Sequence, residues 1–376
     1  MIAPIFDKAH QRVRLDSLTS LRFFAALLVL VHHAAFLLMP GTAVEKVTSV
    51  GYIGVGFFFA LSGFVLTWSL GPAIARRHFY GRRAARIYPM HLVTALVAAV
   101  FLFLVGGDVG LGSSLLNLLL LQSWIPNERY ASSLNGVSWS LCCEAFFYAL
   151  FPILVRRIRP VRRLRWLAGG VAVSLVVTAI AVAAVLPAEL AQQFLYKCPP
   201  YRVGAFLLGI ILATAFQRGY RSPVTVPAAL FANAVTYLLA MSLISVLPRV
   251  GVEPLRVYAD LVTLPAALLL IVAAASADRA GCRSWLRTPW LVRLGEASFA
   301  LYMVHYLLLL MWVELVGSSS DAWRGLAAVC MSCIVSIGVS VAAYRWFERP
   351  AEAVLRRRIG GPRSAQPVNP KLASAS

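Results

Sequence analysis

Charged residues are scarce in this chain of 376 residues, and acidic residues are the scarcest. Asp and Glu total 15, charged residues make up 13% of the sequence, and hydrophobic residues make up 60%. Soluble domains carry about a quarter charged residues, so this composition excludes an ordinary soluble protein. It is typical of a chain that crosses a membrane many times.

Cysteine is also rare, and its spacing offers no framework for disulfides or a metal. Of the six cysteines, Cys330 and Cys333 have C-x-x-C spacing, but no second pair accompanies them. They lie in an apolar stretch, so we expect buried structural thiols and no metal site.

Three other features are missing: a long-period repeat, a soluble catalytic segment and a basic surface interleaved with aromatic residues. The net charge is +20, but the basic residues cluster in short segments between apolar stretches. This distribution argues against nucleic-acid binding. The first apolar run has no small-residue cleavage site, so we expect it to be retained as a helix.

Ten apolar stretches are long enough to cross a membrane, which predicts an all-α, polytopic membrane protein with about ten transmembrane helices. They are residues 21–39, 51–70, 88–105, 137–155, 166–186, 203–217, 226–247, 257–275, 291–316 and 325–346. Residues 113–125 are apolar but shorter, and a crossing there would invert every later loop. We therefore expect a re-entrant or interfacial segment near 113–125.

The basic residues are divided unevenly between the two sides of this predicted fold. Of the 35 Lys and Arg residues, 28 fall on the side that holds both termini. The positive-inside rule makes that side cytoplasmic. We expect residues 1–350 to form the membrane domain. Residues 351–376 would form a cytoplasmic tail, basic at first and then disordered because it is polar and rich in Pro and Ser.

The first predicted helix contains an arginine and a histidine, and an ionisable residue inside a membrane helix marks a candidate functional site. Arg22 and His33 are eleven residues apart, so they share one face with ~16 Å between them, whereas His32 points elsewhere. A neutral histidine can take a proton from a hydroxyl group, which makes His33 a candidate general base. A core histidine bonded to a carbonyl is the alternative.

Five arginines lie within eleven residues after the second predicted helix, in RRHFYGRRAARIYP. Arg83 and Arg86 are at i and i+3, a spacing that lets two guanidinium groups converge on a phosphate. Anionic lipid headgroups are the alternative partner. We expect this segment to be a loop, with Pro89 close to the start of the third helix.

Two more ionisable residues lie inside apolar stretches. Glu144 could orient a histidine, act as a base or bond to a packed helix. His305 lies in the middle of its stretch, with Tyr302 on the same face. Together with His33, these residues predict a polar pocket.

Three residues near span ends have simpler expected roles. Arg202 is expected at the outer end of its helix, where Gly204 and Gly209 would permit close helix approach. Asp260 and Glu314 are expected to be interfacial.

Six segments resemble, in their order, the acyltransferase-3 family of integral-membrane acyltransferases, over residues from about 15 to about 350. They contain Arg22 with His33, the stretch GVGFFFALSGFVL, Arg83 with Arg86, Glu144, Arg202 and His305. The RFFAALL opening and the double histidine look most like the antibiotic-tailoring branch, which includes macrolide 3-O-acyltransferases. The exopolysaccharide-modifying branch is also similar.

The resemblance implies transfer of an acyl group, often acetyl, from acyl-CoA to a hydroxyl of a sugar or secondary metabolite at the cell membrane. No permanently bound cofactor is implied, and both termini would be cytoplasmic. His33 would be the general base, Arg22 its partner, and Arg83 and Arg86 would lie near CoA. Glu144 or His305 would orient His33 or hold the acceptor.

The sequence departs from the family in two respects. Ala205 replaces a carboxylate often found three residues after the family's arginine, and no esterase domain is fused to the chain. An acyl-His or acyl-Cys intermediate, the latter through Cys142 or Cys143, is the alternative mechanism, but an apolar site disfavours a reactive thiol. The alternative function is a proton-coupled secondary transporter or exporter of a polar metabolite or glycan.

Overall fold

The computed structural model describes residues 14–70 and 76–359, which are mostly helical and contain no strand. The helices are α1 (Asp16–Leu38), α2 (Ala43–Thr48), α3 (Gly54–Ser69), α4 (Arg76–Leu104), α5 (Leu111–Leu118), α6 (Glu128–Ala131), α7 (Trp139–Ile158), α8 (Leu164–Val185), α9 (Ala188–Gln192), α10 (Pro199–Gln217), α11 (Val226–Val246), α12 (Arg256–Arg279), α13 (Pro289–Glu296), α14 (Ser298–Val316), α15 (Ala322–Ala343) and α16 (Arg349–Ile359).

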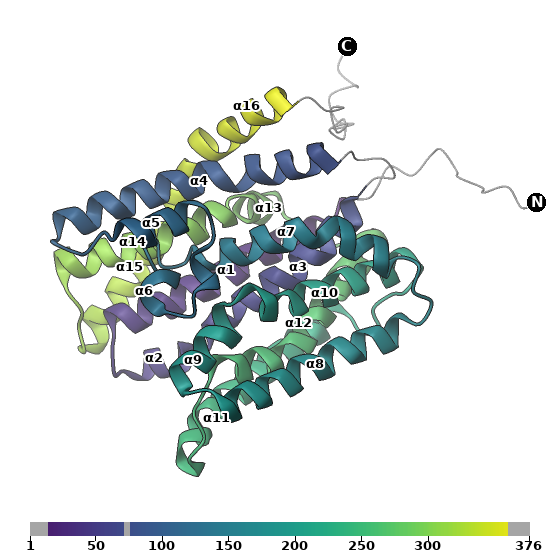
Figure 1. The fold of residues 1–376 in the computed structure, drawn as a ribbon, viewed down its shortest axis with the longest axis horizontal. Helices are drawn as coiled ribbons and strands as arrows, with labels where there is room; N and C mark the ends of the chain where they lie inside the picture. Colours follow the sequence, from purple (N-terminus) through teal and green to yellow (C-terminus); the bar gives the residue numbers. More distant parts are fainter. Residues whose placement is uncertain (1–13, 71–75, 360–376) are drawn as a thin grey trace, which may run out of the picture.

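Each of the ten predicted spans corresponds to a long helix, and these helices pack as one bundle (Figure 1). In the described part of the chain, nine helical stretches are long and apolar enough to cross a membrane, so the protein is a polytopic membrane protein. The predicted span 137–155 corresponds to α7, which is not among these nine stretches. Helix α7 has 20 residues but carries three charged residues, Glu144, Arg156 and Arg157. It packs against α4 and α10 within the bundle.

The helices differ in how much of their surface the protein covers. In the stretch Ala43–Ser69, which contains α3, 78% of the apolar window is buried, against 6% in the stretch Val226–Val250 that contains α11. A helix that is apolar all round but uncovered by protein must face lipid. The central helices α1 and α3 therefore provide the interior in which a site can be built, and α8 and α11 form an outer edge (Figure 1).

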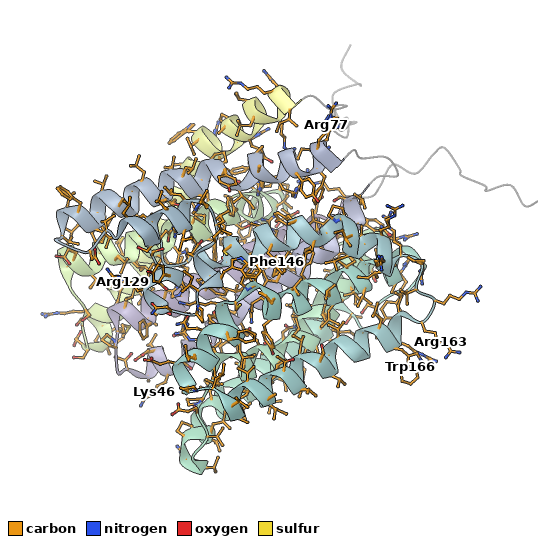
Figure 2. The ribbon with its side chains drawn as sticks, in the orientation of Figure 1. Lys46, Arg77, Arg129, Phe146, Arg163 and Trp166 are labelled. Atoms are coloured by element: carbon orange, nitrogen blue, oxygen red, sulfur yellow. The ribbon has the colours of Figure 1, made fainter. Side chains whose placement is uncertain are left out.

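The bundle has two distinguishable ends. Arg77 and Arg163 lie towards one end, and Lys46 and Arg129 towards the other (Figure 2). Arg14 and Tyr344 both donate hydrogen bonds to Glu296, so the start of α1 and the end of α15 lie at the same end. We call the end that contains Arg77 and Arg163 the basic end.

The arginine-rich segment was expected to be a loop, and this expectation is wrong. Helix α4 begins at Arg76 rather than near residue 88, and Pro89 lies inside it. A proline inside a helix removes one backbone hydrogen bond and is tolerated where packing compensates. Here α16 packs along α4, and Ile359 of α16 fits against Gly81. The helix therefore extends through the arginines.

Residues 113–125 form only the short helix α5 and a 3₁₀ turn, Gln122–Trp124, so they are too short to cross a membrane, as predicted. Buried polar contacts hold this segment in place. The Asn117 side chain donates to the carbonyl of Ser133 (2.6 Å) and to Oγ of Ser138 (2.9 Å), and the His91 ring contacts the carbonyl of Asn117.

Two further expectations concern the thiols of Cys330 and Cys333 and the C-terminal tail. Cys330 is exposed on α15 and Cys333 is only half-buried, so the prediction of buried thiols is wrong for Cys330. The expected boundary at residue 350 falls within α16. Residues 360–376, to which the prediction of disorder applies, lie outside the described residues.

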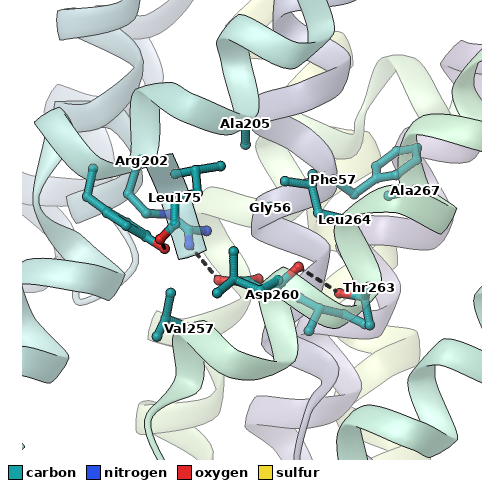
Figure 3. A pocket seen from close by; sticks show the side chains of 13 residues that line it. Gly56, Phe57, Leu175, Arg202, Ala205, Val257, Asp260, Thr263, Leu264 and Ala267 are labelled. Carbon is teal, nitrogen blue, oxygen red and sulfur yellow. Dashed lines mark hydrogen bonds and ion pairs between the residues drawn. The ribbon is translucent and has the colours of Figure 1, made fainter. Parts of the chain in front are cut away.

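A buried ion pair joins α10 to α12 (Figure 3). Arg202 and Asp260 lie 2.5 Å apart and are 4% and 8% exposed, so the expectation that Asp260 is interfacial is wrong. Ala205 lines the same small pocket. The carboxylate that pairs with Arg202 therefore comes from α12 and not from position 205 of α10. Glu314, in contrast, is exposed near the end of α14.

The close crossing of α3 and α10 depends on two glycines. A Cβ on Gly209 would lie 2.0 Å from the carbonyl oxygen of Ala60, and a Cβ on Gly63 would lie 2.2 Å from that of Phe206. Both obstacles are backbone atoms, which cannot rotate away. The prediction that Gly209 permits close helix approach is confirmed.

We expect Gly209→Ala to destabilise the protein by about 1–3 kcal/mol, because the two helices must separate to admit the methyl group. The measurement is the temperature at which detergent-solubilised protein loses its monodisperse size-exclusion peak. Gly170→Ala is the matched control, since no atom lies within 4 Å of its new Cβ on α8. Equal melting temperatures for the two variants would contradict this account of the crossing.

Candidate active site

Two histidines from distant parts of the chain meet inside the bundle. Nδ1 of His33 on α1 lies 3.0 Å from Nε2 of His305 on α14, and the two rings are stacked with centroids 5.3 Å apart. His305 is fully buried, and His33 is half-buried. The sequence indicated both residues separately, and the structure brings them into direct contact.

Hydrogen bonding selects the tautomer of both rings. Nδ1 of His305 lies 3.1 Å from the carbonyl oxygen of Leu301, which can only accept, so this nitrogen carries a proton. In neutral His305, Nε2 is then unprotonated and accepts from Nδ1–H of His33. Neutral His33 is left with an unprotonated Nε2. That nitrogen can accept a proton, as a general base must.

The neighbours of His33 differ in their roles. Nδ1 of His32 contacts the carbonyl of Thr48 at 2.9 Å, so His32 points away from His305, as the helical phase indicated. On another side, the ring of Tyr306 lies edge-on to His33 with centroids 5.1 Å apart. Tyr306, which the sequence reasoning missed, follows His305 directly.

A cavity of about 130 Å³ lies between the histidines and the basic end. Arg22 from α1, Arg83 and Arg86 from α4, and Glu144 from α7 all line it. Three guanidinium groups and one carboxylate line the cavity, and two further carboxylates pair with Arg86. Guanidinium groups are well suited to binding an anionic ligand such as a phosphate. The structure therefore groups Arg22 with Arg83 and Arg86, which the sequence analysis had treated as separate features.

Glu144 lies with the arginines rather than with the histidines. Its carboxylate accepts a hydrogen bond from the hydroxyl of Tyr148 at 3.0 Å, and Ser62 on α3 lies 3.5 Å from the same hydroxyl. Within the described residues, no hydrogen bond joins Glu144 to a histidine. Its contact with Tyr148 lies within α7 and is none of the three expected roles, and its carboxylate forms part of the cavity wall.

Tyr302 connects the cavity to the histidine pair. Its side chain lines the cavity, and its ring centroid is 5.8 Å from that of His305 one turn further along α14. Its hydroxyl donates to the carbonyl of Val137 at 3.3 Å. Neither histidine lines the cavity, so Tyr302 is the side chain that contacts both the cavity and His305.

Two acidic residues at the chain's C-terminal end, which the sequence reasoning missed, contact one of these arginines. Nη1 of Arg86 lies 2.8 Å from Glu348 and 3.2 Å from Glu352. Arg83 instead stacks on the ring of Tyr148, with its guanidinium carbon 5.9 Å from the ring centroid. Arg83 and Arg86 thus share the cavity but differ in their partners.

A segment at the other end of the bundle covers the histidines. Asn135 donates to the carbonyl of Met303 at 2.8 Å, and Gly136 fits against the ring of Tyr306. The same segment is fixed through Glu128, which pairs with Lys197 at 2.6 Å.

Burial raises the pKa of Glu128, but hydrogen bonds from Lys197 and its neighbours outweigh this and lower the pKa to about 2. Glu128 is therefore ionised near neutral pH, and its ion pair with Lys197 holds the segment in place.

The adjacent cysteines of α7 are directed away from the cavity. Cys142 and Cys143 are both buried, and the thiol of Cys143 donates to the carbonyl of Lys197 at 3.3 Å. Neither lines the arginine cavity. The described part of the chain also holds no group of three or more His, Cys, Asp or Glu side chains suited to a metal ion.

The sequence was compared with known proteins. The chain is 38% identical to the acyltransferase MdmB of Streptomyces mycarofaciens, covering 96% of this chain and 99% of MdmB. It is 28% identical to the exopolysaccharide production protein ExoZ of Rhizobium meliloti, covering 82% and 91% of the two chains. The peptidoglycan O-acetyltransferase OatA of Listeria monocytogenes is 25% identical over 38% of this chain and 24% of OatA.

No solved structure matches the chain. These relatives lend no support to the alternative of a transporter. The profile of the acyltransferase-3 family, described as an acyltransferase domain, matches residues 15–345, which include the histidine pair and the arginine cavity. The chain therefore belongs to the acyltransferase-3 family of membrane acyltransferases.

Proposed function

We propose that this protein transfers an acyl group, acetyl in the simplest case, from acyl-CoA to a hydroxyl of a carbohydrate or a secondary metabolite such as a macrolide. It would act in the cell membrane, with ten helices and both termini in the cytoplasm. The single observation behind this proposal is the hydrogen-bonded chain from Leu301 through His305 to His33, next to a cavity lined by arginines.

The arginines would bind the donor. The phosphates of acyl-CoA would lie at the basic end among Arg22, Arg83 and Arg86, because guanidinium groups bind phosphate through charge-assisted hydrogen bonds. The pantetheine arm would extend past Tyr302 towards His33. Arg22 and His33 lie ~16 Å apart along α1, so one ligand could be held at both ends of this interval.

The histidine pair would perform the proton transfers. Nε2 of His33 would take the proton of the acceptor hydroxyl while the oxygen attacks the thioester carbonyl carbon. The carbon–sulfur bond would then break, and the leaving thiolate would take the proton from the His33 imidazolium. His305 would be a positioning residue that fixes the His33 tautomer, as the third member of a catalytic triad does.

We expect His33→Ala to reduce acyl transfer by at least ~100-fold, because the base would be lost. The measurement is incorporation of label from radioactive acetyl-CoA into a macrolide or glycan acceptor by purified protein, alongside binding of CoA. CoA binding should persist, since the arginines are unchanged. His32→Asn is the control, because its amide can still donate to Thr48. Full activity of His33→Ala would contradict the assignment of the base.

A second comparison tests the role of His305. In His305→Ala, Nδ1–H of His33 loses its acceptor, so we expect kcat to fall about 10- to 100-fold with little change in the KM for acetyl-CoA. In His305→Gln, the amide oxygen can accept from His33, so part of kcat should return. Equal losses in the two variants would show that His305 serves only packing.

A further inference from the structure

The C-terminal helix reaches the arginine cavity from outside the region that the family profile covers. The profile ends at residue 345, and Glu348 and Glu352 lie beyond it. A π-helical turn, Tyr344–Glu348, joins α15 to α16, and α16 then packs along α4 (Figure 1). In this arrangement, both carboxylates face Arg86.

The two carboxylates are held differently. Glu348 is 1% exposed and lies 2.8 Å from Arg86, so removing it would leave a partly buried guanidinium without its nearest counter-ion. Glu352 is further from Arg86, at 3.2 Å, and also pairs with Arg356 on its own helix at 2.5 Å. The side chain of Arg356 is 42% exposed. Glu352 can therefore separate from Arg86 and remain paired with Arg356, while Arg86 remains paired with Glu348.

An anionic donor entering the cavity must compete with these carboxylates for Arg86. We propose that Glu352 is a resident counter-ion that the donor's phosphates displace, and that Arg356 then becomes a further phosphate ligand beside Arg83 and Arg86. Glu348 remains in place and positions Arg86. This inference rests on the proposed use of acyl-CoA and extends its binding site to α16.

The test compares two donors that carry the same thioester. Acetyl-CoA has the phosphates, and acetyl-pantetheine lacks them. Glu352→Gln removes the competing charge, so we expect the KM for acetyl-CoA to fall about two- to fivefold. Arg356→Gln removes a ligand, so we expect the same KM to rise about two- to fivefold. The KM for acetyl-pantetheine and kcat for either donor should be unchanged in both variants.

Arg358→Gln is the matched control, because Arg358 lies on α16 about 200° around the helix from Arg356 and makes no ion pair among the described residues. Arg356 is partly exposed, so Arg356→Gln should fold even if Glu352→Gln does not. A KM for acetyl-CoA equal to wild type in Arg356→Gln, or a higher one in Glu352→Gln, would overturn the role of α16. Absence of transfer and of CoA binding in the wild-type protein would instead contradict the proposed function itself.

Discussion

The hydrogen bond between His33 and His305 joins the first membrane helix to one that lies some 270 residues later, and the other features of the site are arranged around it. Two imidazoles in an apolar interior need partners, since an unpaired polar group there is costly. The carbonyl of Leu301 provides the remaining partner and fixes both tautomers. A structural requirement for pairing thus also prepares one nitrogen of His33 to accept a proton.

The charged residues of the arginine cavity lie apart from the histidine pair. The arginines and their carboxylate partners lie towards the basic end, and the imidazoles lie deeper in the bundle, with Tyr302 between them. A separate ion pair, Arg202 with Asp260, fastens α10 to α12. Separation of this kind suits a ligand with a charged end and a reactive end.

Close helix packing makes room for the aromatic side chains that surround the site. Near the crossing of α3 and α10 at Gly63 and Gly209, Phe59 lies edge-on to Phe147, and Phe147 stacks on Phe206, with centroids 5.0 Å apart in each pair. The ring of Phe59 lines the arginine cavity and also contacts the guanidinium of Arg202, at 5.2 Å. The glycines allow the two helices to approach, and the phenylalanine rings fill the space beside the crossing, so the interior is closely packed there.

The sequence by itself determined the membrane class, the approximate positions of the long helices and the family, and it indicated candidate site residues, because apolar length, charge distribution and helical phase are local properties. His33 could be distinguished from His32 by phase alone. Only the tertiary structure decided that His305 is the partner of His33, that Glu144 lies with the arginines, and that Asp260 is buried against Arg202. It also revealed Glu348 and Glu352 at Arg86. These pairings join residues far apart in the chain, and their partners are set by how the helices pack, which no local pattern specifies.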